Sequence, residues 1–185
     1  NESYKAKLAF EAFQHTADYD SAISNWISKE RDLQASKYIE SYPLIKTLRY
    51  GENPHQKAFW YGLSNIGWNS AEQLQGKELS YNNLLDLESA LSTILEFGYE
   101  EKDILTTKKY ASVILKHNNP CGAAMSNSAS QAFLNALECD SVSAFGGIVA
   151  FNSIVDTKTA INLKDIFLEC VVAPSFEEEA LEILK

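Results

Sequence analysis

The stretch that decides the fold is Ala111-Ser112-Val113-Ile114-Leu115-Lys116-His117-Asn118-Asn119-Pro120-Cys121-Gly122. Its first five residues are apolar or small and include β-branched side chains, which predicts a buried strand over 111–115. Pro120 and Gly122 predict a loop that leaves this strand after the polar residues. The stretch therefore indicates a core strand whose end carries a cation and an imidazole.

Helices and strands are expected to alternate on both sides of this stretch. Apolar spacing predicts helices over 82–97, 129–137, 157–167 and from 177 onward, and apolar runs predict strands over 148–151 and 170–173. Alternation of this kind favours a mainly parallel sheet with helices on both faces. The sequence thus predicts an α/β fold, a three-layer α/β/α sandwich.

A different pattern precedes the sandwich. Residues 3–29 carry two apolar helical patterns, and 16–18 offer a cap between them, which predicts a helical hairpin. Residues 30–42 are polar and predict a linker, and short extended segments are expected over 43–50 and 57–61. We therefore expect a helical linker region ahead of the α/β sandwich.

Composition narrows the class of protein. The 185 residues are 45% hydrophobic and 22% charged, as in ordinary globular proteins, and no apolar run is long enough to cross a bilayer. The net charge of -9 argues against non-specific nucleic-acid binding. Three scattered cysteines, Cys121, Cys139 and Cys170, fit no disulfide framework. We expect a cytoplasmic protein without a nucleic-acid or membrane partner.

Lys116 and His117 are the first candidate site residues. Ligands of α/β proteins bind beyond the carboxyl ends of strands, where these two side chains are expected. A Lys and a His side by side supply a cation and a base near neutral pH. The alternative is a Lys and a His that end a strand in solvent, which is the commoner outcome for an isolated pair.

Four further residues are of types that bind polar ligands. Arg49 is a permanent cation suited to a phosphate or carboxylate, and Tyr50 beside it can stack on a ring or donate a hydrogen bond. Gly146 precedes a strand, so it belongs to no dinucleotide or P-loop fingerprint, and it marks either a backbone approach to a ligand or a tight turn. Glu169 is a carboxylate just ahead of the strand expected over 170–173. A surface Arg, a packed Tyr and a solvated carboxylate are the plainer alternatives.

Four stretches together resemble AICAR transformylase, the formyltransferase domain of the bifunctional purine biosynthesis enzyme. The stretches, in the family's order, are 48–56 (LRYGENPHQ), 79–86 (LSYNNLLD), 116–122 (KHNNPCG) and 140–147 (DSVSAFGG). The resemblance extends over essentially the whole chain. It implies transfer of a formyl group from 10-formyltetrahydrofolate, the co-substrate, to the 5-amino group of AICAR.

The resemblance also implies roles and partners. Lys116 and His117 would be catalytic, and the AICAR-binding residues would be Arg49, Tyr50, His117, Gly146 and Glu169. The family is similar in fold to cytidine deaminase and acts as a homodimer with its active site near the subunit interface. Folate contacts would come largely from the second half of the transformylase domain.

The domain assignment follows from the same resemblance. Residues 1–40 would be the helical C-terminal tail of the IMP cyclohydrolase domain with its linker, and residues 41–185 would be the N-terminal part of the transformylase domain. The cyclohydrolase catalytic residues would lie upstream. Since the chain starts without Met and ends inside a helical pattern, we expect a fragment that is poorly active alone.

Three alternative functions remain open. Pro120-Cys121 invites comparison with zinc deaminases, which use H-x-E and P-C-x-x-C, but Ala124 stands where the second Cys belongs and no His begins an H-x-E. We therefore expect no metal.

Cys121 as a nucleophile lacks a base specified by spacing. A non-catalytic purine-nucleotide-binding module, using Arg49 and the Lys116 loop, and a purely structural or dimerisation piece are the others.

Overall fold

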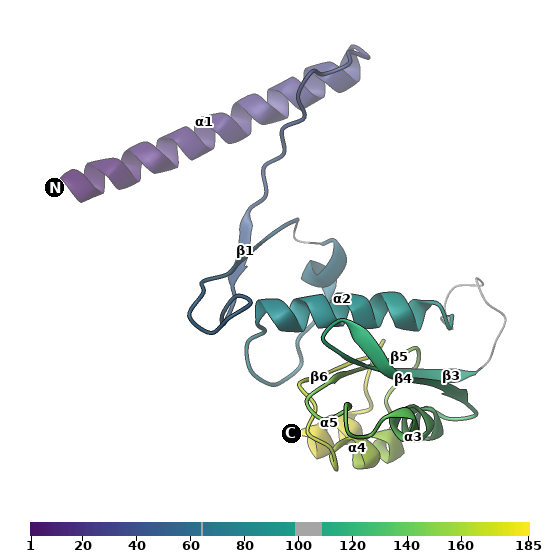
Figure 1. Ribbon diagram of the computed structural model, residues 1–185. Helices are drawn as coiled ribbons and strands as arrows, with labels where there is room; N and C mark the ends of the chain where they lie inside the picture. Colours follow the sequence, from purple (N-terminus) through teal and green to yellow (C-terminus); the bar gives the residue numbers. More distant parts are fainter. Residues whose placement is uncertain (64, 99–108) are drawn as a thin grey trace. The chain divides into compact units, whose positions relative to one another are not determined.

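The computed structural model describes residues 1–63, 65–98 and 109–185 (Figure 1). The chain divides into a smaller compact unit, residues 1–46 with 60–71, and a larger one, residues 47–59 with 72–185. All six candidate site residues belong to the larger unit. The larger unit is therefore the part of the chain in which a functional site is expected.

The smaller unit begins with one long helix, α1 (Glu2–Glu30). The predicted helical hairpin is wrong, because nothing interrupts the helix at 16–18. Thr16 Oγ donates to the Phe13 carbonyl at 3.2 Å, so its hydroxyl bonds back into the helix instead of capping a new one. No residue of α1 is buried.

None of the helices that the structure describes is long and apolar enough to pass through a bilayer.

Two short strands and a single 3-10 turn follow α1. Residues 31–43 form no helix or strand, as expected for a linker. Strands β1 (Leu44–Thr47) and β2 (Phe59–Tyr61) pair as a two-stranded sheet, which confirms both predicted extended segments. The 3-10 helix η1 (Gly67–Ser70) lies between β2 and the larger unit's first helix along the chain.

The four-stranded sheet of the larger unit is mixed, with the strand order β4-β3-β5-β6. Its strands are β3 (Tyr110–Lys116), β4 (Asn119–Ser126), β5 (Ile148–Phe151) and β6 (Cys170–Val172). β3 runs antiparallel to both β4 and β5, and β5 and β6 are parallel. The α/β class is confirmed, whereas the predicted mainly parallel sheet is wrong.

A tight hairpin explains the difference. Only His117 and Asn118 join β3 to β4, with φ values of 52° and 61°. Positive φ at both residues of a two-residue loop marks a type I′ turn, whose twist matches paired antiparallel strands. The predicted exit loop is therefore wrong, because Pro120 and Gly122 lie within β4. β4 is an edge strand, where a residue without an N–H is tolerated.

Helices cover both faces of this sheet. They are α2 (Tyr81–Leu95), α3 (Ala129–Cys139), α4 (Thr157–Leu163) and α5 (Glu178–Leu184). Figure 1 shows α2 along one face, with α3, α4 and α5 on the other. All four predicted helices are confirmed, although α4 ends four residues earlier than expected. β3 lies between α2 and α3, and its residues 111–115 are fully buried.

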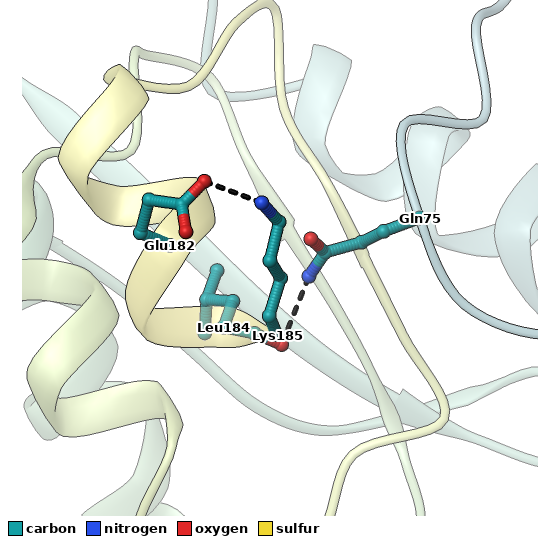
Figure 2. Close-up of polar contacts among 4 residues, drawn as sticks. All are labelled: Gln75, Glu182, Leu184 and Lys185. Carbon is teal, nitrogen blue, oxygen red and sulfur yellow. Dashed lines mark hydrogen bonds and ion pairs between the residues drawn. The ribbon is translucent and has the colours of Figure 1, made fainter.

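A capping box starts α2. Ser80 Oγ accepts from the Asn83 N–H at 3.2 Å, and Asn83 Oδ1 accepts from the Ser80 N–H at 2.9 Å. The loop ahead of this cap is tied to the C-terminal helix, because Gln75 Nε2 donates to the Leu184 carbonyl at 2.9 Å (Figure 2). The segment from Gln75 to Ser80, which leads into α2, is therefore held at its start by Leu184 and at its end by the cap.

Gly122 offers a test of the hairpin's packing. A Cβ at this position would lie 1.9 Å from the Ala136 carbonyl oxygen of α3, which leaves no room for a side chain. We expect Gly122→Ala to lower the free energy of unfolding by about 3 kcal/mol, because a backbone carbonyl must move. Denaturant unfolding measures this. The matched control is Ala123→Ser, at the exposed neighbouring position, which should change stability little; equal stability of both variants would contradict this packing.

Candidate functional site

The site begins where β3 leaves the core. Leu115 is fully buried, Lys116 is half-buried and His117 is exposed. Exposure to solvent therefore increases with each residue at this strand end. Lys116 Nζ donates to the Phe145 carbonyl at 2.7 Å. This bond fixes the ammonium against the loop that precedes β5, one residue from Gly146.

Two glycines shape that loop. Gly146 has a φ of 72°, a conformation that favours glycine, and its N–H donates to the Phe167 carbonyl at 2.7 Å. A Cβ on Gly147 would lie 2.7 Å from the Leu115 carbonyl oxygen. The loop backbone can therefore lie directly against the end of β3, which brings Gly146 and Lys116 together.

Glu169 joins the same group through its backbone and its side chain. Its N–H donates to the Gly147 carbonyl at 3.0 Å. Its Oε2 accepts from Asn83 Nδ2 at 2.5 Å. Asn83 uses its oxygen in the cap of α2 and its nitrogen for Glu169, so one buried amide connects the helix start to the carboxylate.

Arg49 and Tyr50 pair with the residues that flank the same cap. The Arg49 N–H donates to the Leu79 carbonyl, and the Tyr81 N–H donates to the Tyr50 carbonyl, each at 3.1 Å. The Arg49 guanidinium carbon lies 4.9 Å from the centre of the Tyr50 ring, within cation–π range. The backbone thus holds a cation and an aromatic side by side near the start of α2.

The pKa of the Cys170 thiol depends on the charged residues of the site. The pKa of Cys170 is raised to about 11, mainly by burial and next by the neighbouring Glu169 carboxylate. The Arg49 guanidinium opposes this increase, and Asp86 of α2 adds to it. Arg49, Glu169 and Asp86, which are far apart in the sequence, therefore act on the same sulfur atom.

The sequence prediction missed several residues of this region. Asn83 and Asp86 both lie in the 79–86 stretch, where the sequence predicts a helix cap at Asn82 or Asn83 and no role for Asp86. Phe145 and Phe167 are exposed, with ring centres 5.4 Å apart, and they present flat apolar surface beside Gly146. Phe145 belongs to the 140–147 stretch, whereas Phe167 lies beyond α4, which ends at Leu163 and not at 167 as the sequence predicts.

The structure bears on the alternatives to an acid-base site. Burial raises the pKa of the Cys121 thiol, whose Sγ donates to the Ile114 carbonyl at 3.5 Å. A protonated, inward-facing thiol is a weak nucleophile. Across residues 1–63, 65–98 and 109–185, no three His, Cys, Asp or Glu side chains form a group that could hold a metal ion.

Five of the six predicted residues are thus linked by short contacts around the start of α2 and the end of β3. Lys116, Gly146 and Glu169 meet at the 145–147 backbone. Arg49 and Tyr50 reach the group through the α2 cap. His117 lies apart, on the exposed turn, two residues beyond the buried end of the strand core. The arrangement offers two cations, a carboxylate, an imidazole and backbone polar groups.

Comparisons with known proteins show which family the chain resembles. A family model described as AICARFT/IMPCHase bienzyme matches residues 1–185. The chain is 89% identical over 184 residues to the Bifunctional purine biosynthesis protein PurH of Prochlorococcus marinus subsp. pastoris (strain CCMP1986 / NIES-2087 / MED4). It is 89% identical to the PurH protein of strain AS9601 and 54% identical to that of strain MIT 9313. Each match covers 100% of this chain and 36% of the relative, so the chain spans about a third of these relatives' length.

The electrostatic link between Arg49 and Cys170 is testable. Because the guanidinium favours the thiolate, Arg49→Ala should raise the pKa of Cys170 and slow its alkylation by iodoacetamide at pH 9–10 by about two- to threefold. Peptide-resolved mass spectrometry separates Cys170 from the other two cysteines. Lys164→Ala, which removes an exposed cation from the end of α4, should leave the rate unchanged. An unchanged rate in Arg49→Ala would show that the cation does not act on this thiol.

Proposed function

The chain belongs to the AICARFT/IMPCHase bienzyme family, and from this premise we propose that it carries the AICAR half-site of a formyltransferase of purine biosynthesis. The reaction is transfer of a formyl group from 10-formyltetrahydrofolate to the 5-amino group of AICAR. The observation that carries the proposal is the Lys116 ammonium, held 2.7 Å from the Phe145 carbonyl at the end of β3, where His117 is the next residue in the sequence. The purine-biosynthesis names of the relatives support it.

The reaction requires a base and an acid. The AICAR amine is conjugated to an imidazole carboxamide and is a weak nucleophile, so it must lose a proton as its nitrogen bonds to the formyl carbon. The bond from that carbon to the folate nitrogen then breaks, and the folate nitrogen gains a proton. His117 takes the amine proton, directly or by relay. Lys116 stabilises the oxyanion of the tetrahedral intermediate or protonates the leaving nitrogen.

The remaining residues bind AICAR. Arg49 is suited to the phosphate, because its guanidinium is permanently charged and forked, and Tyr50 supports it from 4.9 Å. Gly146 allows the backbone to approach the ligand without a Cβ. Glu169, oriented by Asn83, accepts hydrogen bonds from a ribose hydroxyl or an amine.

The finer features of the assembly belong to the same proposal. We place the larger unit with cytidine deaminase-like α/β/α sandwiches, and the active site near the interface of a homodimer in the cytoplasm. The second half of the transformylase domain supplies most of the folate contacts, and because the chain spans 36% of the relatives' length, we expect it to be poorly active alone.

A non-catalytic nucleotide-binding module is the second candidate. It rests on the same two cations, because Arg49 and Lys116 would hold a phosphorylated nucleotide without any chemistry. The two functions differ in what His117 does. In a binding module, loss of the imidazole changes affinity slightly and removes no turnover.

The deciding experiment replaces His117 in the full-length protein. His117→Ala should lower kcat for formyl transfer by about 100- to 10,000-fold, the usual contribution of a general base, and leave the unfolding temperature unchanged, because the side chain is exposed. AICAR affinity, measured by calorimetric titration, should fall much less than kcat. Arg49→Ala is the matched variant and should weaken AICAR binding. A wild-type protein that binds AICAR without formyl transfer would favour the binding module.

A further inference from the structure

The turn that carries His117 has an unusual backbone. His117 and Asn118 are two of the three non-glycine residues with positive φ in the described part of the chain. This left-handed conformation is sparsely populated by L-residues, and Asn tolerates it better than His. Pairing of β3 with β4 favours this conformation, and a contact from outside the hairpin adds to it.

That contact, the anchor of the turn, comes from α2. Asp86 Oδ1 accepts from the Asn118 N–H at 2.7 Å. With its amide nitrogen toward the helix, the orientation that satisfies donors and acceptors, the Asn118 side chain also donates to Asp86 Oδ1 at 3.0 Å and to Ser89 Oγ at 3.3 Å. One carboxylate thus holds the turn through both the backbone and the side chain of Asn118.

The position of the imidazole depends on this backbone. Among the contacts of the described residues, no hydrogen bond involves the His117 ring, while Asn119 Nδ2 donates to the His117 carbonyl at 2.9 Å. Because no partner holds the ring, the φ and ψ of His117 set the direction of the Cα–Cβ bond from which the imidazole extends. Whatever fixes the turn therefore fixes the point from which the base can reach the ligand.

We propose that Asp86 is a positioning residue for His117, which acts by holding Asn118 in the left-handed conformation. The proposal rests on the formyltransferase function. It assigns no contact between Asp86 and substrate. Its chemistry is that of a hydrogen-bond acceptor, so the oxygen matters and the negative charge does not.

Kinetics of the full-length protein test this role. Asp86→Ala should lower kcat about 10- to 100-fold, as expected when a catalytic group is misplaced by about 1 Å, with the KM for AICAR changed by less than about twofold. Asp86→Asn retains an acceptor oxygen and should keep most of the activity. Asp86→Ala combined with Asn118→Gly should recover part of kcat, because glycine adopts positive φ freely. Asp165→Ala, an exposed carboxylate elsewhere in the larger unit, is the control.

Three outcomes would overturn the proposal. They are an unchanged kcat in Asp86→Ala with only a lower unfolding temperature, a loss in Asp86→Asn as large as in Asp86→Ala, and no recovery when Asn118→Gly is added to Asp86→Ala. The crystal structure of Asp86→Ala gives a reading that needs no activity: loss of positive φ at His117 and Asn118 supports the anchor, and retention contradicts it. If the wild-type protein transfers no formyl group, the proposed function fails, while this structure still decides whether Asp86 fixes the turn.

Discussion

The burial of β3 between α2 and α3 is the constraint on which the site depends. Its five residues from 111 to 115 have no exposed surface, so the strand cannot shift along its neighbours without moving polar atoms into the core. The first side chain able to reach solvent is that of Lys116, and the backbone reverses immediately afterwards. The cation and the imidazole are therefore placed by the packing of apolar side chains behind them.

The polar groups around this strand end are held mainly by backbone atoms. The Phe145 carbonyl accepts from Lys116, and two further carbonyls accept from the N–H groups of Gly146 and Glu169. Backbone hydrogen bonds at the start of α2 hold Arg49 and Tyr50. Backbone partners do not neutralise the side chains they position. The Lys116 and Arg49 charges consequently remain available to an anionic ligand, and the Glu169 carboxylate keeps one oxygen beyond its bond to Asn83.

Local patterns predicted most elements because their signals are local. The apolar runs of β3 and β5 place in the core the same residues that the structure buries there. In α2 the structure buries Leu87 and Ile94 of the predicted apolar stripe, whereas Leu95 is exposed. The β3–β4 hairpin was missed because β4 contains Pro120 and Gly122 and few β-branched residues, which are features of loops. Its strand character comes from pairing with β3 and from the close contact of Gly122 with α3, neither of which is visible in the sequence.

The sequence by itself determined the α/β class, the strand end at Lys116 and the residue types of the site, because periodicity and composition act over a few neighbouring positions. It also carried the resemblance that names the family. Only the tertiary structure decided the strand directions and the joining of Arg49, Asn83 and Glu169 around one helix start. Two residues with positive φ reverse the chain between β3 and β4 and so set the direction of these strands. The site is assembled by hydrogen bonds between segments up to 86 positions apart. Sequence patterns hold no information on distances over that range.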